Sequence, residues 1–323
     1  MPSISVVIPV HGVADYLDRC LDSVLGQADS SLEVITIDDA SPDDSGQILA
    51  ARHDPRLRTI RTESPVGPGH ARELGAKEAT GEYVWFVDGD DELAGGALAA
   101  VAAELDRTRP DVLIIDYENL YPDGSTSPSG AGIRATDATT LEQQPALIHL
   151  TMTVWSKVFR REFLASLGAG FGPGIHEDVP VSVAALLAAD RIAVLDRVCY
   201  RYRRSRRGSF MAATSDRHFD IFRSYNHIFS ERTAVPPVRA ALFERAIWHY
   251  TTVFPLVPRR RRREFFGRMA ADFLRWRPDE FVFPPGPRGM KLRLVARGAY
   301  RTYRALEPLN RLRIFLSRRA TRR

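Results

Sequence analysis

The segment Tyr83–Asp91 constrains the fold of this chain more than any other. Its sequence is YVWFVDGDD, an apolar, β-prone run that ends in three carboxylates within four residues. Like charges at this spacing repel one another, so a fold that holds them together needs a cation or cationic side chains nearby. A strand that delivers Asp-x-Asp at its C-terminal end in an α/β pattern predicts a site for a metal and a phosphorylated ligand. The alternative is an acidic loop that caps a helix beginning near Leu93.

The first 46 residues predict a parallel sheet. Residues 4–10 and 32–39 are apolar runs with strand character, and residues 14–27 between them carry apolar side chains at helical spacing. A strand, a helix and a strand within 40 residues form a βαβ unit, so the two strands run parallel. Ligands of such sheets bind beyond the carboxyl ends of the strands. Asp38 and Asp39 are therefore expected at the same edge as Asp88.

A Gly- and Pro-rich loop at residues 64–69 leads into a helix of small residues that stops at Gly81. Backbone amides at such a helix start suit an anion, and Arg72, one turn into the helix, is placed to reach a phosphate. The alternative is that Arg72 is an ordinary solvated helix residue.

Four motifs in this order resemble those of the family 2 glycosyltransferases, which have a GT-A fold and use nucleotide-activated sugars. The motifs are VVIPV (6–10), IDDASPDDS (37–45), GPGHARELG (67–75) and AxGEYVxFVDGDD (79–91). The resemblance is close over about the first 120 residues and loose to about residue 210. Two positions depart from the family pattern: His11-Gly12 replaces Tyr-Asn, and Glu73 replaces Asn. The implied fold class is α/β, a Rossmann-like and mainly parallel sheet flanked by helices, followed by an all-helical basic region.

The resemblance also implies roles for the residues at the strand ends. Asp39 matches the position that binds the uracil N–H of a UDP-sugar donor. Asp88 matches a ribose-binding or metal-shell position, and Asp90 matches the direct ligand of Mn²⁺ or Mg²⁺, ions that prefer oxygen ligands. The implied nucleotide-binding set also contains Pro9, Val10 and Arg72.

The segment GIHEDVP at residues 174–180 supplies the candidate base. It follows a Gly-rich loop and precedes an apolar helix. A sugar transferase needs a base to take the proton of the acceptor hydroxyl, and the Glu-Asp motif of the family implies Asp178 in that role. Glu177 would orient the acceptor or share the metal shell. Alternatively Asp178 caps the helix, and His176 is expected to line the loop because no second His lies at ligand spacing.

Two further segments resemble the acceptor and diphosphate regions of the family. Trp155 is a candidate for stacking on a sugar ring, with burial in the core as the alternative, and Lys157 follows it on the acceptor side. Arg207 and Ser209 are candidates for a loop that closes over the diphosphate. A solvated basic loop is the alternative for these two residues.

Composition predicts a globular catalytic domain at residues 1–212 and a helical basic region at 213–323. Two cysteines, Cys20 and Cys199, are too few for a disulfide framework. The chain enters a strand soon after Met1, and no apolar run reaches 18 residues. We therefore expect a cytoplasmic protein, peripheral at the inner face of the cell membrane.

Charge is uneven along the chain. Residues 257–323 hold 20 Lys and Arg against 5 Asp and Glu, although the net charge of the whole chain is +5. Expected helices here and upstream cover Asp216–Ser230, Val238–Phe254, Arg262–Trp276, Met290–Leu306 and Leu309–Arg319. A basic amphipathic helix suits an anionic membrane surface. Alternatively its apolar face packs on its own domain; nucleic-acid binding is not expected, because no recognition motif accompanies the charge.

These features predict an inverting, metal-dependent transferase that moves a sugar from a UDP-sugar to a hydroxyl of a cell-envelope glycan or polyol-phosphate polymer. The Glu-Asp motif and the Arg-rich loop resemble those of bacterial enzymes that build teichoic-acid-type polymers. The alternative is a non-catalytic sugar-nucleotide-binding or basic adaptor protein at the membrane.

Overall fold

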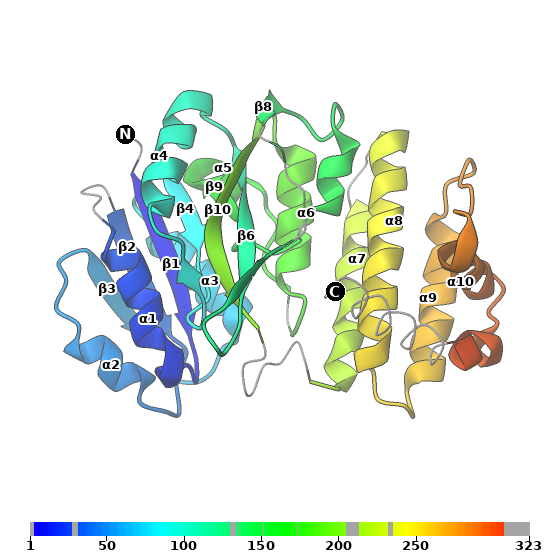
Figure 1. Ribbon diagram of the computed structural model, residues 1–323, viewed down its shortest axis with the longest axis horizontal. Coiled ribbons are helices and arrows are strands. Elements are labelled where there is room, and N and C mark those ends of the chain that lie inside the picture. The colour runs from blue at the N-terminus through cyan, green and yellow to red at the C-terminus, as the bar shows by residue number, and fades with distance from the viewer. Residues whose placement is uncertain are drawn as a thin grey trace.

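The computed structural model describes residues 3–27, 32–129, 134, 136–150, 152–172, 174–204, 213–231 and 235–306 (Figure 1). A central sheet is covered by helices on both faces, and a row of helices continues from one face toward the C-terminus. This arrangement agrees with the predicted α/β class and with the predicted helical C-terminal region.

One mixed sheet holds its main strands in the order β3-β2-β1-β4-β9-β6-β10-β5. Strands β3, β2, β1 and β4 are parallel to one another, β9 runs antiparallel between β4 and β6, and β10 is parallel to β6. Strands β7 and β8 lie off this path, beside β6 and β10. The strand bounds are β1 Ile4–Val10, β2 Leu32–Asp38, β3 Leu57–Arg61, β4 Tyr83–Phe86, β5 Glu92–Leu93, β6 Val112–Leu120, β7 Thr126–Pro128, β8 Thr136–Thr139, β9 Lys157–Arg160 and β10 Ile192–Arg203.

Side chains that alternate along β1 enter two hydrophobic clusters, one on each face of the sheet. Val6 and Ile8 belong to the cluster that includes α1, α2 and α4, whereas Val7 belongs to the cluster that includes α3 and α6. Burial on both faces explains why β1 is an almost continuous apolar run. The bounds of the helices around the sheet are α1 Ala14–Leu25, α2 Ser45–Ala51, α3 Pro68–Glu78, α4 Ala97–Thr108, η1 Pro145–His149, α5 Arg161–Ser166 and α6 Asp178–Ala188.

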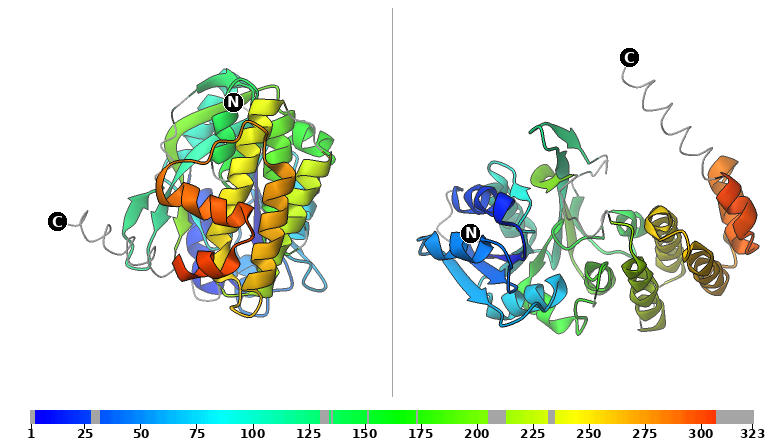
Figure 2. Two further views of the ribbon diagram at one scale, coloured as in Figure 1. Left: turned by 90° about the vertical axis from the view of Figure 1, so that its right-hand side faces the viewer. Right: turned by 90° about the horizontal axis from the view of Figure 1, so that it is seen from below.

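The C-terminal helices extend from the α6 side of the sheet, as Figure 1 and the right-hand view of Figure 2 show. Their bounds are η2 Asp216–Phe219, α7 Asp220–Glu231, α8 Pro236–Val253, η3 Phe254–Leu256, α9 Arg262–Trp276 and α10 Gly286–Ala296. Buried side chains of these helices, such as Tyr225 and Phe265, share one hydrophobic cluster with Val7 and Phe86 of the sheet. A domain boundary after residue 212 remains a prediction, and this apolar cluster crosses it.

The helix expected at 290–306 is wrong in one respect. Helix α10 ends at Ala296, Gly298 adopts a positive φ of 63°, and helical structure resumes at 300–306. Glycine tolerates this left-handed conformation, which ends a helix. The helix expected at Leu309–Arg319 lies outside the described residues.

The apolar face of this basic segment packs on the protein itself. Leu292, Val295 and Tyr303 are buried in the main hydrophobic cluster, while Arg293 and Arg297 are exposed. This is the alternative in which the helix covers its own domain. None of the helices in the described part of the chain combines the length and the hydropathy needed to span a bilayer.

Candidate active site

The ends of β1, β2 and β4 bring the acidic motifs to one edge of the sheet. In the register of these parallel strands Val10 lies opposite Asp38, and Val7 lies opposite Phe86. The backbone N–H of Asp39 donates to the Val10 carbonyl at 2.8 Å. The predicted nucleotide-binding residues Pro9, Val10, Asp39 and Asp88 are therefore on neighbouring strand ends, as the βαβ argument expects.

The Asp39 carboxylate anchors the loop before α3. Its oxygens accept hydrogen bonds from the backbone N–H groups of Val66 at 2.7 Å and Gly67 at 2.8 Å, and from the Thr62 hydroxyl at 3.1 Å. The anion held by these amides is thus Asp39 itself, which differs from the expected use of the helix start for a ligand phosphate. A carboxylate has about four acceptor sites, so an acceptor site remains for the predicted contact with a uracil N–H.

Arg72 joins the Asp-x-Asp motif to the segment that carries the candidate base. Its guanidinium donates through Nη2 to Asp88 Oδ1 at 2.6 Å and through Nη1 to Glu177 Oε1 at 2.7 Å. Burial opposes the charge of this guanidinium, but the Asp88 and Glu177 carboxylates outweigh burial and raise the pKa of Arg72. The prediction of a phosphate contact placed Arg72 at the site, whereas its bridge between two carboxylates follows only from the fold.

Asp91, the third carboxylate of the motif, is a structural anchor that the sequence analysis did not assign. Its side chain is buried and accepts hydrogen bonds from the Tyr200 hydroxyl and from the Arg203 backbone N–H, both at 2.7 Å. Burial, together with the charges of Asp90 and Asp88, raises the pKa of Asp91. The Tyr200 oxygen also accepts a hydrogen bond from the Asp88 N–H at 3.1 Å. Strand β10 therefore fixes the conformation of residues 88–91.

Asp88 and Asp90 carry the oxygen ligands that the metal prediction requires. Asp88 is engaged by Arg72, and the Asp90 backbone carbonyl accepts from Arg203 Nε at 2.7 Å. Within the described residues, no three His, Cys, Asp or Glu side chains are grouped closely enough to hold a metal on their own. A cation at Asp90 would therefore take most of its ligands from a diphosphate and water, a mode typical of Mg²⁺. The donor set fits an oxygen-bound divalent cation whose site is completed by the nucleotide.

Asp178 is the first residue of α6 and lies partly exposed beside Glu177. No side-chain hydrogen bond caps this helix, so the structure does not support the alternative role as a cap. Burial raises the pKa of Asp178 to about 7, the Glu177 charge adds to the increase, and Arg72 opposes it. A carboxyl group with a pKa near the working pH is suited to exchange a proton with a hydroxyl.

Trp155 and Lys157, the predicted acceptor residues, are both buried. The Trp155 ring stacks on Tyr200 and on Tyr202, with centroid distances of 4.5 and 5.4 Å, as the core alternative expects. Lys157 Nζ donates to the Thr153 carbonyl at 2.9 Å, and burial lowers the pKa of Lys157 to about 7. Acceptor contact by either residue remains a prediction. Arg207 and Ser209 lie outside the described residues.

Arg245 of α8 is a basic residue that sequence reasoning missed. It lies close enough to Lys157 for their charges to interact. Its Nη1 donates to the His149 carbonyl at 3.2 Å, and its guanidinium lies 4.5 Å from the ring centroid of the exposed Trp248. Burial lowers the pKa of Arg245. No sequence signal separates this arginine from the other charged residues of the helical region.

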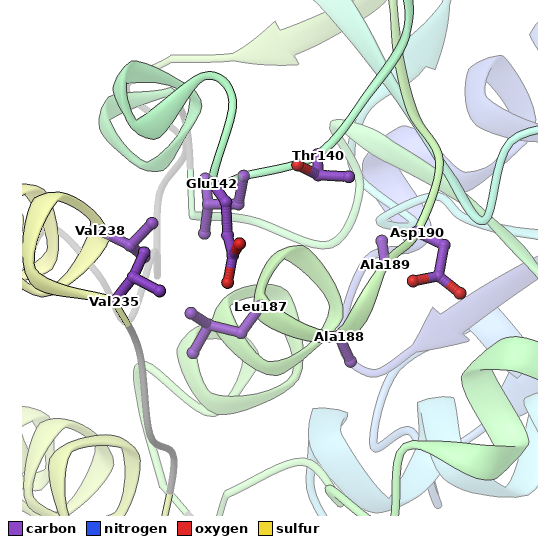
Figure 3. Close-up of a pocket in the computed structure, with 9 residues that line it drawn as sticks. Thr140, Glu142, Leu187, Ala188, Ala189, Asp190, Val235 and Val238 are labelled. Atoms are coloured by element: carbon purple, nitrogen blue, oxygen red, sulfur yellow. The ribbon is translucent and has the colours of Figure 1, made fainter.

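A pocket of about 260 Å³ lies at the opposite end of α6 from Asp178 (Figure 3). Its lining includes Leu187 and Ala188 from α6, Val238 from α8, and Glu142 from the segment before η1. Helix α6 has 11 residues, so at about 1.5 Å per residue its two ends are roughly 15 Å apart. This pocket is therefore separate from the edge where the motif carboxylates meet.

Known proteins share this sequence pattern. Residues 5–167, about half of the chain, match the family model Glycosyl transferase family 2. The uncharacterized glycosyltransferase EpsJ of Bacillus subtilis (strain 168) is 30% identical over 212 residues, which cover 63% of this chain and 61% of EpsJ. The poly(ribitol-phosphate) beta-N-acetylglucosaminyltransferase TarS of Staphylococcus aureus (strain Mu50) is 30% identical over 219 residues, which cover 66% of this chain and 37% of TarS.

The fold is also that of a solved structure. The crystal structure of S. aureus TarS 1–349 in complex with UDP-GlcNAc superposes with a TM-score of 0.77 and 24% identity, over 96% of this chain and 92% of that chain. This likeness agrees with the GT-A fold expected from the motifs. The fold is shown by this structural likeness, and the match to the family model shows that the chain belongs to glycosyl transferase family 2.

Proposed function

We propose that this protein is an inverting, metal-dependent glycosyltransferase that moves a sugar from a UDP-sugar to a hydroxyl of a cell-envelope glycan or polyol-phosphate polymer. The observation that carries the proposal is the bridge from Arg72 to Asp88 and Glu177, with contacts of 2.6 and 2.7 Å. The single side chain of Arg72 thus spans the distance between the Asp-x-Asp motif and the segment that carries Asp178. Donor and acceptor groups must be this close for a single displacement.

Asp178 is the proposed base. Its carboxylate takes the proton of the acceptor hydroxyl while the acceptor oxygen forms a bond to the anomeric carbon of the sugar. The bond between that carbon and the diphosphate oxygen breaks in the same step, so the configuration inverts. A pKa of about 7 leaves a large fraction of Asp178 ionised at neutral pH and still basic enough to accept the proton.

Asp39, Asp88 and Asp90 are the proposed donor-side residues. Asp39 would bind the uracil ring, and Asp88 would bind the ribose or share the metal shell. Asp90 would ligate Mn²⁺ or Mg²⁺, which supplies positive charge to the diphosphate of the leaving group. The UDP-GlcNAc complex of TarS supports a UDP-sugar as the donor class, and Pro9, Val10, Arg207 and Ser209 complete the proposed set.

The acceptor is proposed to be a polymer at the cell envelope, on the basis of the poly(ribitol-phosphate) named for TarS. Lys157 and Trp155 are proposed to line its side of the site, supported by the position of Lys157 close enough to Asp178 for their charges to interact. Exposed arginines of the C-terminal helices, Arg293 and Arg297 among them, are proposed to draw the protein to an anionic membrane surface. The division into a catalytic domain at 1–212 and a helical region at 213–323 is part of the proposal.

A donor screen tests the proposed function. Purified protein is incubated with a panel of UDP-sugars, including UDP-GlcNAc, with Mn²⁺, Mg²⁺ or EDTA, and with or without poly(ribitol-phosphate). We expect UDP release that depends on the metal and increases with the acceptor. If no nucleotide sugar binds or is turned over under any of these conditions, the transferase assignment is wrong.

A further inference from the structure

Three histidines from distant segments meet behind the segment that carries the proposed base. His176 precedes Glu177, His218 lies in η2, and His249 lies in α8. His176 Nε2 is 3.4 Å from His218 Nδ1, and the His176 ring lies edge-on to His249 at a centroid distance of 5.0 Å. The fold thus provides His176 with partners that its sequence neighbourhood lacks.

The hydrogen bonds define which nitrogen of His218 carries its proton. His218 Nε2 is 2.9 Å from the Ala213 carbonyl, which only accepts, so Nε2 is the donor. Burial lowers the pKa of His218, and burial lowers the pKa of His176 to about 3, so both rings are neutral near pH 7. The remaining nitrogen of His218, Nδ1, is then an acceptor, and His176 Nε2–H donates to it.

The backbone of the base segment needs such support. His176 has a φ of 67°, in the left-handed region that non-glycine residues rarely adopt. Gly174, two residues earlier, has a φ of 87°, and a Cβ on it would lie 2.0 Å from Asp220 Oδ2 of α7. The His176 carbonyl accepts from the Ser224 hydroxyl of α7 at 3.3 Å. Side chains of η2 and α7 therefore contact His176, the strained residue, and lie against Gly174 before it.

We propose that His218 is a positioning residue of the transferase: by accepting a hydrogen bond from His176 it holds the segment 174–178 in the conformation that places Asp178 at the acceptor. The proposal rests on the proposed function, in which Asp178 is the base. It makes η2 and α7, which lie beyond the residues matched by the family model, part of the catalytic apparatus. Donor binding is left to the sheet edge; within the described part of the chain, the His218 ring bonds to His176 and to the Ala213 carbonyl.

Two variants of His218 separate its two hydrogen bonds. His218→Asn retains an acceptor near the position of Nδ1 but loses the donor to Ala213, whereas His218→Gln retains a donor near Nε2 but loses the acceptor toward His176. We expect His218→Gln to lower turnover about tenfold to hundredfold, the cost of a displaced catalytic group, with the KM for the UDP-sugar unchanged. His218→Asn should retain most of the turnover. His227→Ala, an exposed histidine on α7, is the control and should behave as native.

His176→Gly tests the same idea from the other side. Glycine accepts the positive φ without strain, so a segment shaped by its backbone alone would keep full turnover. We expect turnover to fall as in His218→Gln, because the hydrogen bond is lost, with no loss of affinity for UDP. Native turnover in His176→Gly, or equal losses in His218→Asn and His218→Gln, would overturn the proposal.

An NMR measurement on the native protein decides the case even where a variant unfolds. Long-range ¹H–¹⁵N correlation spectra of ¹⁵N-His protein report the protonated nitrogen of each ring, and we expect Nε2–H on both His176 and His218. If His218 Nδ1 carries a proton, it cannot accept a hydrogen bond from His176. That result would overturn the proposal. Asp178→Asn is assayed in parallel. Native turnover in that variant contradicts the proposed base, whereas loss there with native turnover in His218→Gln contradicts the positioning role alone.

Discussion

The donor edge of the sheet and the base segment are held in place by different kinds of interaction. At the donor edge, Asp39 and Asp88 follow the ends of β2 and β4, and the hydrogen-bond register with β1 fixes where they lie. In the described residues, the base segment at 174–178 is preceded by helix α5 and an irregular stretch instead of a strand. It is held by Arg72 from α3, by Ser224 from α7 and by His218 from η2.

This difference predicts which changes matter to each half of the reaction. Substitutions at the strand ends should alter donor and metal binding through the replaced side chain alone, because the whole sheet supports the backbone there. Substitutions around the base segment should alter turnover and leave donor binding intact. The predictions below test this separation, beginning with the largest expected effect.

The largest effect is expected for Asp178→Asn. Turnover should fall by about two to four orders of magnitude, the usual weight of general acid–base catalysis, while the affinity for UDP stays at the native value. Steady-state kinetics and calorimetry with UDP measure the two quantities. Asp190→Asn, an exposed acid beyond the other end of α6, is the matched control.

The pH dependence gives a second test of the same residue. Because burial raises the pKa of Asp178 to about 7, the base is protonated at acidic pH, and turnover should rise with pH through about 7. The raised pKa also means that ionisation of Asp178 lowers the free energy of unfolding. This stability is therefore lost as pH rises through 7. Asp178→Asn should therefore be more thermostable than native protein at pH 8. A lower melting temperature there would count against a carboxyl group whose pKa the fold raises.

Asp90→Asn should affect the donor side. Turnover should fall by about two to three orders of magnitude, the range typical for removal of one group that stabilises developing charge. UDP binding should weaken in the presence of Mn²⁺ and remain unchanged in EDTA, because the lost charge belongs to the metal site. Titration calorimetry with and without Mn²⁺ makes the comparison. If native protein binds UDP equally well in both conditions, the cation has no part in donor binding.

Arg72→Lys should affect both sides, since Arg72 connects them. A lysine carries one ammonium group and cannot span two carboxylates as the planar guanidinium does. We expect the free energy of unfolding to decrease by about 3 kcal/mol, as when a buried ion pair is broken, and turnover to fall about tenfold to hundredfold through misplacement of Glu177 and Asp178. Chemical denaturation and kinetics measure these effects. Arg58→Lys, at a more exposed ion pair with Glu78, is the control and should change neither.

Removal of the chain after Pro284 should have the smallest effect on turnover per folded molecule, because every group assigned to chemistry precedes it. The melting temperature should decrease, since Leu292, Val295 and Tyr303 leave the hydrophobic cluster. Binding to anionic vesicles should also decrease, and for the full chain it should weaken as salt rises. Sedimentation with vesicles that contain phosphatidylserine, against neutral vesicles, gives the measurement. Vesicle binding that the truncation leaves unchanged would assign membrane attachment to another surface.

Much of the donor edge could be predicted from the sequence. The βαβ pattern and the Asp-x-Asp strand end were sufficient to place Asp39 and Asp88 at one edge, because parallel strands joined by a helix bring their carboxyl ends together. The sequence was less informative about burial. Trp155 is in the core and Lys157 is fully buried, and periodicity over a few residues does not distinguish a side chain that faces a ligand from one that faces another strand.

The sequence by itself determined the class of fold, the family and the edge of the sheet where the acidic motifs meet, because these depend on local hydrophobic patterns and on strand order. Only the tertiary structure decided that Arg72 pairs with Glu177, 105 residues away, that Asp91 is fixed by Tyr200, and that His176 meets His218 and His249. Contacts of this kind depend on how helices from distant parts of the chain pack on a shared hydrophobic cluster. Packing depends on the combined shape of many buried side chains, which no single motif specifies.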